Sequence, residues 1–301
     1  MIEVTDALDR QVRLARPAER VVSLVPSETA SVADLVGVER LVGRTDYCVE
    51  PLGEVETIPS VGGTKGFDVG AVRALRPDLV LANKEENSRP LVQALMADGL
   101  AVHVSFPCTV DQSLHYLESL ALLLGVDADQ SLELVSCRTA AHPVRREKEG
   151  KAVPVFVPIW REPWMTFDGG AYASDLLEIC GAHNVFSKRP RLYPLAADLG
   201  KASPRAGGNL DERDTRYPRI RLDEVLERGA RAVLLPDEPY AFGDEDAAVF
   251  RALDVSPPLL VEPVDGKDLF WYGTRVAGAV ARVREQVERL RASCFGGQPN
   301  N

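Results

Sequence analysis

Short apolar runs alternate with amphipathic stretches along the first 125 residues of the chain. The run at residues 21–25 is continuous and rich in valine, which is typical of a strand buried on both faces of a parallel sheet. Pro26 ends this run, and Ser27 is expected to cap a helix over residues 28–36 that stops at Gly37. Further strands are expected at 41–43, 79–82 and 100–105, and further helices at 68–75, 88–99 and 109–124. This alternation predicts an α/β lobe built on a parallel sheet.

The pattern changes between residues 127 and 149, where a charged stretch carries only a thin apolar stripe. A poorly amphipathic helix between two alternating regions is typical of a connector. The alternation then resumes, with strands expected at 152–157, 232–235 and 259–264 and helices at 173–180, 222–228 and 274–293. We therefore predict an N-terminal α/β lobe at 1–126, a connecting backbone helix at 127–149 and a C-terminal α/β lobe at 150–301. Residues 187–219 are rich in Pro, Gly, Arg and Asp and form a long surface insertion in this scheme.

Charge and composition exclude several classes of partner. The net charge of −10 over 301 residues disfavours nucleic acid and anionic membrane surfaces. No apolar run approaches the ~20 residues of a membrane-spanning helix, so we expect no membrane insertion. The N-terminal residues lack the pattern of a signal peptide, and the five cysteines are scattered and odd in number. These features predict a cytoplasmic protein, with a periplasmic or extracytoplasmic location as the alternative if a leader has been removed.

Motifs of catalysis are missing from the sequence. It contains no GxSxG, HExxH or P-loop motif, and its paired glycines do not follow a strand in a dinucleotide-binding frame. The four histidines share no helical spacing, and no Cys/His cluster has the spacing of a metal site. We therefore expect neither a catalytic residue nor a metal site nor a covalent cofactor.

Aromatic residues concentrate in the loops that follow strands, and both halves of the chain supply them. One interpretation is that they close the ends of the core. The other, which we favour, is that they line a cleft and pack on a large, flat ligand. Polar candidates lie beside them, and Arg275 stands out because a cation in the first turn of a helix is disfavoured by the helix dipole. The candidate ligand-binding residues are Tyr47, Asn83, Glu86, Trp160, Trp164, Tyr217, Trp271, Tyr272 and Arg275.

Eight segments together resemble the cobalamin and iron-siderophore substrate-binding proteins of ABC importers, in order and in spacing over nearly the whole chain. The segments are RVVSLVPSET, LVGRTDYC, VGG, LRPDLVLAN, GLAVHV, LLEICGAHNVF, YPRIRLDEVL and WYGTR. The resemblance implies two Rossmann-like lobes joined by one long helix, as in the helical-backbone class of these proteins. It also implies non-enzymatic binding of cobalamin, haem or a ferric siderophore in a shallow cleft.

Carried over by position, Tyr47, Trp164, Tyr217 and Trp271 match pocket residues of the cobalamin-binding members. Asn83 stands where those members have an aromatic residue. The resemblance also implies that Tyr47 could ligate haem iron, as in some relatives. The ligand is then expected between an edge with Tyr47, Asn83 and Glu86 and an edge with Trp164, Tyr217 and Trp271.

The resemblance also implies an ABC permease as partner, contacted through one surface carboxylate on each lobe. Asp223 matches the carboxylate of the second lobe, whereas Gly70 occupies the position of the first, which weakens the expectation of a permease. The first hypothesis is therefore a monomeric receptor for a bulky metal-bearing molecule, with a corrinoid before haem or a siderophore. The alternative is a cytosolic, chelatase-like enzyme that processes a corrinoid or tetrapyrrole, with Glu86 or His183 as proton acceptor.

Overall fold

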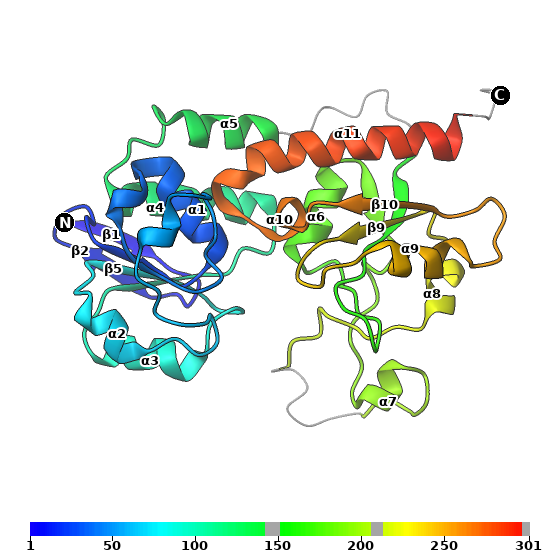
Figure 1. The fold of residues 1–301 in the computed structure, drawn as a ribbon, viewed down its shortest axis with the longest axis horizontal. Helices are drawn as coiled ribbons and strands as arrows, with labels where there is room; N and C mark the ends of the chain where they lie inside the picture. Colours follow the sequence, from blue (N-terminus) through cyan, green and yellow to red (C-terminus); the bar gives the residue numbers. More distant parts are fainter. Residues whose placement is uncertain (142–150, 206–212, 297–301) are drawn as a thin grey trace. The chain divides into compact units, whose positions relative to one another are not determined.

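The computed structural model describes residues 1–141, 151–205 and 213–296 (Figure 1). The chain divides into two compact α/β units, which we describe separately. The first unit contains Met1–His142 and Trp271–Ala277, and the second contains Pro143–Phe270 and Gly278–Asn301. Both main sheets consist of parallel strands, so the α/β class expected from the alternating pattern is confirmed. In the part of the chain that the structure describes, no helix combines the length and the apolar character needed to cross a membrane.

The first unit is a four-stranded sheet in the order β4-β3-β5-β6, preceded by an antiparallel hairpin. Its strands are β1 (Ile2–Thr5), β2 (Gln11–Leu14), β3 (Val21–Ser23), β4 (Leu41–Arg44), β5 (Leu79–Asn83) and β6 (Val102–Ser105). Its helices are α1 (Pro26–Val36), α2 (Val69–Ala74), α3 (Arg89–Ala97), α4 (Val110–Leu124) and α5 (Leu132–Ala141). Three 3₁₀ turns complete it: η1 (Val38–Arg40), η2 (Val55–Thr57) and η3 (Gly273–Arg275).

Helices cover both faces of this sheet, with α1 and α4 on one face and α2 and α3 on the other (Figure 1). This explains why its strands are continuous apolar runs: all five residues of β5 are buried. Val22, Val80 and Val102 lie in register on β3, β5 and β6 and belong to one apolar core. The order of strands and helices expected for this lobe is confirmed.

The helix that follows the first core strand begins earlier than we predicted. Pro26 is its first residue and Val25 occupies the N-cap position, so the prediction that Ser27 caps this helix is wrong. Proline fits the first helical position because its missing N–H would have no partner there and its φ is already helical. In contrast, α2 has a side-chain cap: the Asp68 carboxylate accepts hydrogen bonds from the N–H groups of Gly70 and Ala71.

The second unit is a four-stranded parallel sheet in the order β10-β9-β7-β8. Its strands are β7 (Val153–Phe156), β8 (Ala182–Asn184), β9 (Ala232–Pro236) and β10 (Leu260–Val264). Its helices are α6 (Tyr172–Ile179), α7 (Leu195–Asp198), α8 (Leu222–Glu227), α9 (Asp244–Arg251) and α10 (Gly266–Phe270), with most of α11 (Val276–Phe295). We did not predict β8, α9 or α10, each of which is only three to eight residues long.

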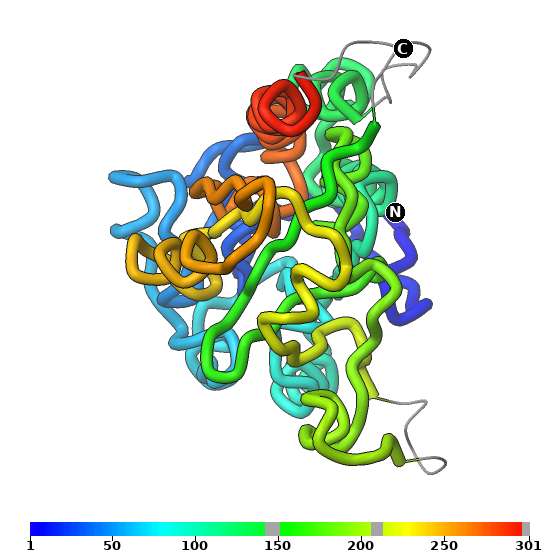
Figure 2. Tube along the Cα trace, turned by 90° about the vertical axis from the view of Figure 1, so that its right-hand side faces the viewer, coloured from blue at the N-terminus to red at the C-terminus, as the bar shows by residue number. Residues whose placement is uncertain are grey.

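The segment expected as a surface insertion carries its own short helix, α7. In two perpendicular views α7 and its flanking residues extend away from the strands β9 and β10 of the same unit (Figures 1 and 2). The helix expected at 127–149 corresponds to α5 over Leu132–Ala141, and the remainder of that prediction, at 142–149, lies outside the described residues.

Candidate functional site

Asn83 organises the carboxyl edge of the first sheet, where ligands of open parallel sheets bind. Its side-chain oxygen accepts hydrogen bonds from the N–H groups of Glu85 at 2.7 Å and Glu86 at 3.1 Å. Its amide nitrogen donates to Ser105 Oγ at 3.2 Å and to Tyr272 Oη at 3.0 Å. Asn83 is 5% exposed, so it shapes the turn that carries Glu86 while offering little surface of its own.

Asn87 ties the same turn to two neighbouring loops. Its side-chain oxygen accepts a hydrogen bond from the backbone N–H of Asn83 at 2.7 Å. Its amide nitrogen donates to the carbonyl oxygens of Leu24 at 3.1 Å and Thr64 at 3.0 Å. The ends of β3 and β5 and the glycine-containing loop at 62–64 are therefore held together by one buried side chain.

A buried carboxyl group lies beneath this edge. Glu28 is fully buried in the first turn of α1, and Tyr272 Oη donates a hydrogen bond to its Oε1 at 3.0 Å. The other oxygen, Oε2, has no hydrogen-bond partner among the described residues. Burial raises the pKa of Glu28 to about 8, because a low-dielectric surrounding disfavours the charged carboxylate. Glu28 is thus a neutral acid at pH 7, and the sequence pattern gave no signal for this role.

The predicted aromatic residues of the first unit differ strongly in exposure. Tyr47, in the loop that follows β4, is 63% exposed. Trp271 and Tyr272 are only 8% and 4% exposed, and the guanidinium of Arg275 lies 5.8 Å from the Trp271 ring centroid. Glu86 and Arg275 are half-buried. Tyr47 is therefore the predicted ring in this unit with a large surface available to a ligand, whereas Trp271 and Tyr272 pack inside the unit.

The carboxyl edge of the second sheet carries a chain of packed rings from two loops. Trp160 and Trp164 lie in the loop after β7, and Tyr240 and Phe242 lie in the loop after β9. The ring centroids of Trp160 and Tyr240 are 5.4 Å apart, those of Tyr240 and Phe242 are 4.6 Å apart, and Trp164 stacks on Phe242 at 5.9 Å. Trp160 is 47% exposed, so the chain begins at the surface.

Two neighbouring side chains, Phe250 and Arg161, hold Trp164 in place within that chain. Its ring meets Phe250 of α9 edge to face at 5.1 Å, and the guanidinium of Arg161 lies 5.6 Å from its centroid. Arg161 also donates to the Asp246 carboxylate at 2.6 Å. These contacts fix the Trp164 indole, which limits the conformational entropy that ligand binding would cost. Tyr217 lies elsewhere in this unit, half-buried, with the Arg216 guanidinium 5.2 Å from its ring.

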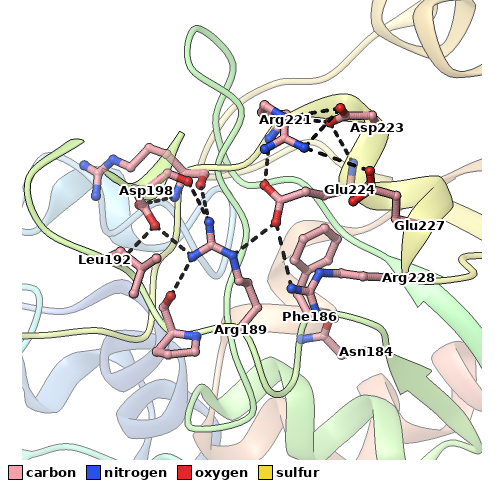
Figure 3. Close-up of polar contacts among 12 residues, drawn as sticks. Asn184, Phe186, Arg189, Leu192, Asp198, Arg221, Asp223, Glu224, Glu227 and Arg228 are labelled. Carbon is pink, nitrogen blue, oxygen red and sulfur yellow. Dashed lines mark hydrogen bonds and ion pairs between the residues drawn. The ribbon is translucent and has the colours of Figure 1, made fainter. Parts of the chain in front are cut away.

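Asp223, the carboxylate expected to contact a permease, lies beside Arg221 in the second unit (Figure 3). The side chain of Asp223 is 60% exposed and accepts a hydrogen bond from Arg221 Nε at 2.9 Å. The adjacent Glu224 differs, because it is buried and pairs with Arg189 at 3.1 Å. Gly70, the position expected to lack the matching carboxylate in the first unit, lies in the first turn of α2.

Arg189 is the centre of a buried ion-pair cluster that holds the segment with α7 against α8 (Figure 3). Besides Glu224, its guanidinium binds Oδ1 of Asp198 at 2.9 Å and the backbone oxygen of Asp198 at 2.6 Å. The other Asp198 oxygen accepts from the N–H of Arg219 at 2.7 Å. Charge-assisted bonds of Arg189 and Asp198 therefore attach this segment to α8 and to Arg219.

The candidate proton acceptors of the enzyme hypothesis belong to different units. His183 is in β8 of the second unit, exposed, with Nδ1 2.8 Å from Glu178 Oε1, whereas Glu86 is in the first unit. Across residues 1–141, 151–205 and 213–296, no three His, Cys, Asp or Glu side chains are grouped so that they could hold a metal ion.

Comparisons with known proteins match this fold. The periplasmic binding protein family profile matches residues 21–207. A vitamin B12-binding protein of Yersinia pestis is 29% identical over 176 residues, which are 58% of this chain and 62% of that protein. The chain thus covers less than two thirds of the length of the curated relatives it matches.

Solved structures extend the likeness to both units. The periplasmic vitamin B12-binding protein of Vibrio cholerae superimposes with a TM-score of 0.69 at 19% identity, covering 91% of this chain and 98% of that one. The periplasmic haem-binding protein of Roseiflexus sp. RS-1 gives 0.68 at 14% identity, covering 91% and 99%. A Helicobacter pylori structure, CeuE, gives 0.73 at 15% identity, covering 98% and 91%.

These matches correct one expectation and decide another. The family is that of periplasmic binding proteins, so the expectation of a cytoplasmic location is wrong: the N-terminal pattern and the cysteine count were not reliable guides to the compartment. The resemblance to cobalamin and iron-siderophore binding proteins is confirmed by the profile, the curated relatives and the fold together. The chain belongs to the periplasmic binding protein family.

Proposed function

We propose that this protein is a non-enzymatic receptor for a corrinoid, with haem or a ferric siderophore as the next candidates. The observation that carries the proposal is the presence of an exposed ring at the carboxyl edge of each sheet, Tyr47 in the first unit and Trp160 in the second. Flat apolar faces suit a macrocycle, because ring stacking adds to the burial of apolar area. The named relatives support the proposal, since they include proteins described as binding vitamin B12 and haem.

The side chains behind these rings are proposed to preorganise the edges rather than to touch the ligand. Asn83 holds the turn that carries Glu86, and Trp164 supports the ring chain that ends at Trp160. Glu86, Tyr217 and Arg275 stay in the proposal as polar contacts or as supports for them. A preorganised site loses less conformational entropy on binding, which raises affinity without additional contacts.

The charge around Tyr47 favours a corrinoid over a ligand with several negative charges. Asp46, Glu50 and Glu54 lie in the same loop. Arg44 at the end of β4 is engaged, because it donates to the backbone oxygens of Val55 at 2.8 Å and Thr45 at 3.0 Å. Lys65 and Lys84, in other loops of this unit, are engaged as well: Lys65 binds the backbone oxygen of Glu85, and Lys84 lies 4.9 Å from the Phe106 ring. An acidic rim disfavours an anionic ligand, since like charges raise the free energy of the complex.

Delivery to an ABC permease is part of the proposal, with Asp223 as a contact. Its side chain is exposed and pairs with Arg221. A permease arginine could replace Arg221 as the partner of Asp223 at little cost, because exposed ion pairs contribute roughly 0–1 kcal/mol. Gly70 provides no carboxylate on the first unit, so the proposed contact there is weaker.

The test is a set of equilibrium titrations with cyanocobalamin, haemin and a ferric siderophore, followed by visible absorbance. Tyr47→Phe keeps the ring and removes the hydroxyl, whereas Tyr47→Ala removes both. A corrinoid held by ring contacts predicts little change for the first variant and about 5–30-fold weaker binding for the second, as for loss of ~1–2 kcal/mol. If haemin binds instead and Tyr47→Phe alters its spectrum, Tyr47 ligates iron and the corrinoid is the wrong ligand.

A matched control is Leu132→Ala, which removes an exposed apolar side chain (77% exposed) from α5 rather than from a strand edge. Its affinity should equal that of the unmodified protein. If none of the three ligands changes the absorbance or the melting temperature, the receptor proposal is wrong.

A further inference from the structure

The second unit carries a concentration of basic residues in a chain that is acidic as a whole. Residues 187–219 contain eight Lys or Arg and four Asp or Glu, whereas the chain has a net charge of −10. A basic region in an acidic protein attracts anions to one place, because the rest of the surface repels them. This segment is therefore a candidate for an anion-binding site.

Two arginines of this segment lie against one tyrosine ring. The guanidinium carbon of Arg191 is 4.5 Å from the Tyr193 ring centroid, and that of Arg213 is 4.9 Å from it. Tyr193 is itself held in place, because its hydroxyl donates to the backbone oxygen of Asp214 at 3.0 Å. A cation–π contact positions a guanidinium without using its N–H groups. The ring thus brings two cations together and leaves their donors available.

Arg219 adds a third positive charge beside Arg191. Burial and the charge of Arg191 lower the pKa of Arg219, because both disfavour its protonated form. An arginine nevertheless stays protonated at pH 7, so the two like charges raise the free energy of the empty site, and a bound anion would relieve the repulsion. We refer to Arg191, Arg213, Arg219 and Tyr193 as the arginine cluster.

The carboxylates near the arginine cluster already have other partners. Asp198 pairs with Arg189 at 2.9 Å (Figure 3), and Asp214 pairs with Arg216 at 2.6 Å. In the part of the chain that the structure describes, none of the three cluster arginines forms an ion pair with a carboxylate. The Asp198 carboxylate also accepts the N–H of Arg219 at 2.7 Å, so the backbone that carries this cation is fixed before a ligand arrives.

The arginine cluster lies beside the exposed indole on which the proposed function depends. Met165 forms antiparallel bridges to Trp160 and to Arg219, and the N–H of Ile220 donates to the carbonyl oxygen of Trp164 at 2.8 Å. Residues directly opposite each other in antiparallel pairs project from the same face, and adjacent backbones are about 4.8 Å apart. The side chains of Trp160 and Arg219 therefore leave one face from backbones ~10 Å apart.

We propose that the arginine cluster binds the phosphodiester of a corrinoid whose ring packs on Trp160. This inference rests on the proposed function and names the part of the ligand that the second unit recognises. The peripheral groups of cobalamin are neutral amides, so its phosphodiester is the anion that guanidinium groups can bind through paired N–H donors. A single negative charge is also consistent with the acidic loop at Tyr47, which disfavours ligands that carry several. The cluster would thus select complete corrinoids over precursors that lack the nucleotide.

The experiment compares cyanocobalamin with cobinamide, which has the same ring but lacks the nucleotide and its phosphodiester. Both are titrated by calorimetry into the unmodified chain, Arg219→Gln and Arg191→Gln. Each substitution is expected to weaken the binding of cyanocobalamin about tenfold, as for loss of a hydrogen bond to a charged group, and that of cobinamide less than about twofold. An increase in NaCl from about 50 mM to about 500 mM should likewise weaken cyanocobalamin binding alone.

Two further variants separate the contact from folding and from overall charge. Arg213→Gln changes an exposed side chain of the cluster, so it tests the cluster without disturbing a buried contact, and it should weaken cyanocobalamin binding at least about threefold. Lys201→Gln removes an exposed cation from the same segment outside the cluster and is the matched control, with both affinities unchanged. An unchanged affinity for cobinamide shows in addition that a variant is folded.

Three results overturn the inference. Equal losses for cyanocobalamin and cobinamide mean that the arginines support the ring contact and not the phosphodiester. An unchanged affinity for cyanocobalamin in all three arginine variants means that the cluster does not touch the ligand, and the receptor proposal then stands without it. If neither corrinoid binds the unmodified protein, the corrinoid proposal is wrong and this inference fails with it.

Discussion

Neutralising Glu28 permanently should remove a pH dependence from the stability of the first unit. The perturbation is Glu28→Gln, which replaces an acid that is neutral when folded by an amide that cannot ionise. Burial raises the pKa of this carboxyl from its ordinary value of 4.5 to about 8. The unfolded chain releases the proton above pH 4.5, while the folded chain keeps it, so the unfolded state binds fewer protons as the pH rises.

The magnitude follows from linkage. The contribution of Glu28 to stability is fully present below pH 4.5 and is lost as the pH rises through about 8. Each pH unit in that interval costs about 1.4 kcal/mol, and the whole interval corresponds to roughly 5 kcal/mol. Between pH 6.5 and about 8 the free energy of unfolding should therefore fall by ~2 kcal/mol because of this one group.

The pH range is chosen because His103 acts in the opposite direction at lower pH. Burial lowers its pKa from 6.5 to about 4, so its contribution is present above pH 6.5 and is lost as the pH falls through 4. Below pH 6.5 the two slopes oppose each other and nearly cancel. Above pH 6.5 the slope of Glu28 remains.

The assay is urea unfolding at several pH values between 6.5 and 8. Trp271 belongs to the first unit, so its fluorescence in a background with Trp160→Phe and Trp164→Phe reports on that unit, because the chain has three tryptophans. We expect a slope of about −1.4 kcal/mol per pH unit that Glu28→Gln abolishes, while the exposed Glu3→Gln keeps it. Parallel curves for the parent and Glu28→Gln would refute the reasoning, whatever the absolute stabilities.

Three further predictions, two of them with a matched control substitution, test other contacts. Arg189→Met should lower the free energy of unfolding of the second unit by about 3–5 kcal/mol in urea, because the buried carboxylates of Asp198 and Glu224 lose their partner. Arg221→Ala, at the exposed pair with Asp223, should lower it by less than ~1 kcal/mol. Gly273→Ala should lower the free energy of unfolding by at least ~2 kcal/mol, since φ is +89° and the new Cβ would collide with Ser31 Oγ. Gly229→Ala, also at positive φ but with no atom near the new Cβ, should lower it by roughly 1 kcal/mol and shift the thermal midpoint less. Asp68→Ala should lower the free energy of unfolding by about 1 kcal/mol, because α2 loses its helix cap; thermal melting followed by circular dichroism measures this.

Much of the fold could be predicted because its strands are continuous apolar runs. The runs at residues 21–25 and 79–82 have few alternatives to a buried parallel strand, and both are strands in the structure. The missed elements are short, such as β8 with three residues, and their apolar content is indistinguishable from that of a loop. The prediction placed the cap of the first helix at Ser27 because serine is a better helix cap than valine. In the structure the helix begins at Pro26, because proline suits the first helical position, and Val25 is left as the cap.

The candidate site was predictable only in part, because position along the chain does not determine exposure. Tyr47 and Trp160 both follow strands and are exposed, whereas Trp271 and Tyr272, which the pattern also placed after a strand, follow α10 and are buried. Their burial depends on contacts with residues more than 150 positions away, such as the bond from Asn83 to Tyr272, which no local pattern reports. The same is true of Glu28, whose partner is 244 residues distant.

Residues 271–277 complete the first unit, although most of that unit is encoded in the first 142 residues. The backbone N–H of Gly273 donates to Ser113 Oγ, and the N–H of Thr274 donates to Ser31 Oγ, in addition to the bond that Tyr272 makes to Glu28. Synthesis must therefore reach residue 277 before the first unit can close its interior. The nascent chain stays incomplete until then, which keeps it available to chaperones and makes truncated products targets for proteolysis.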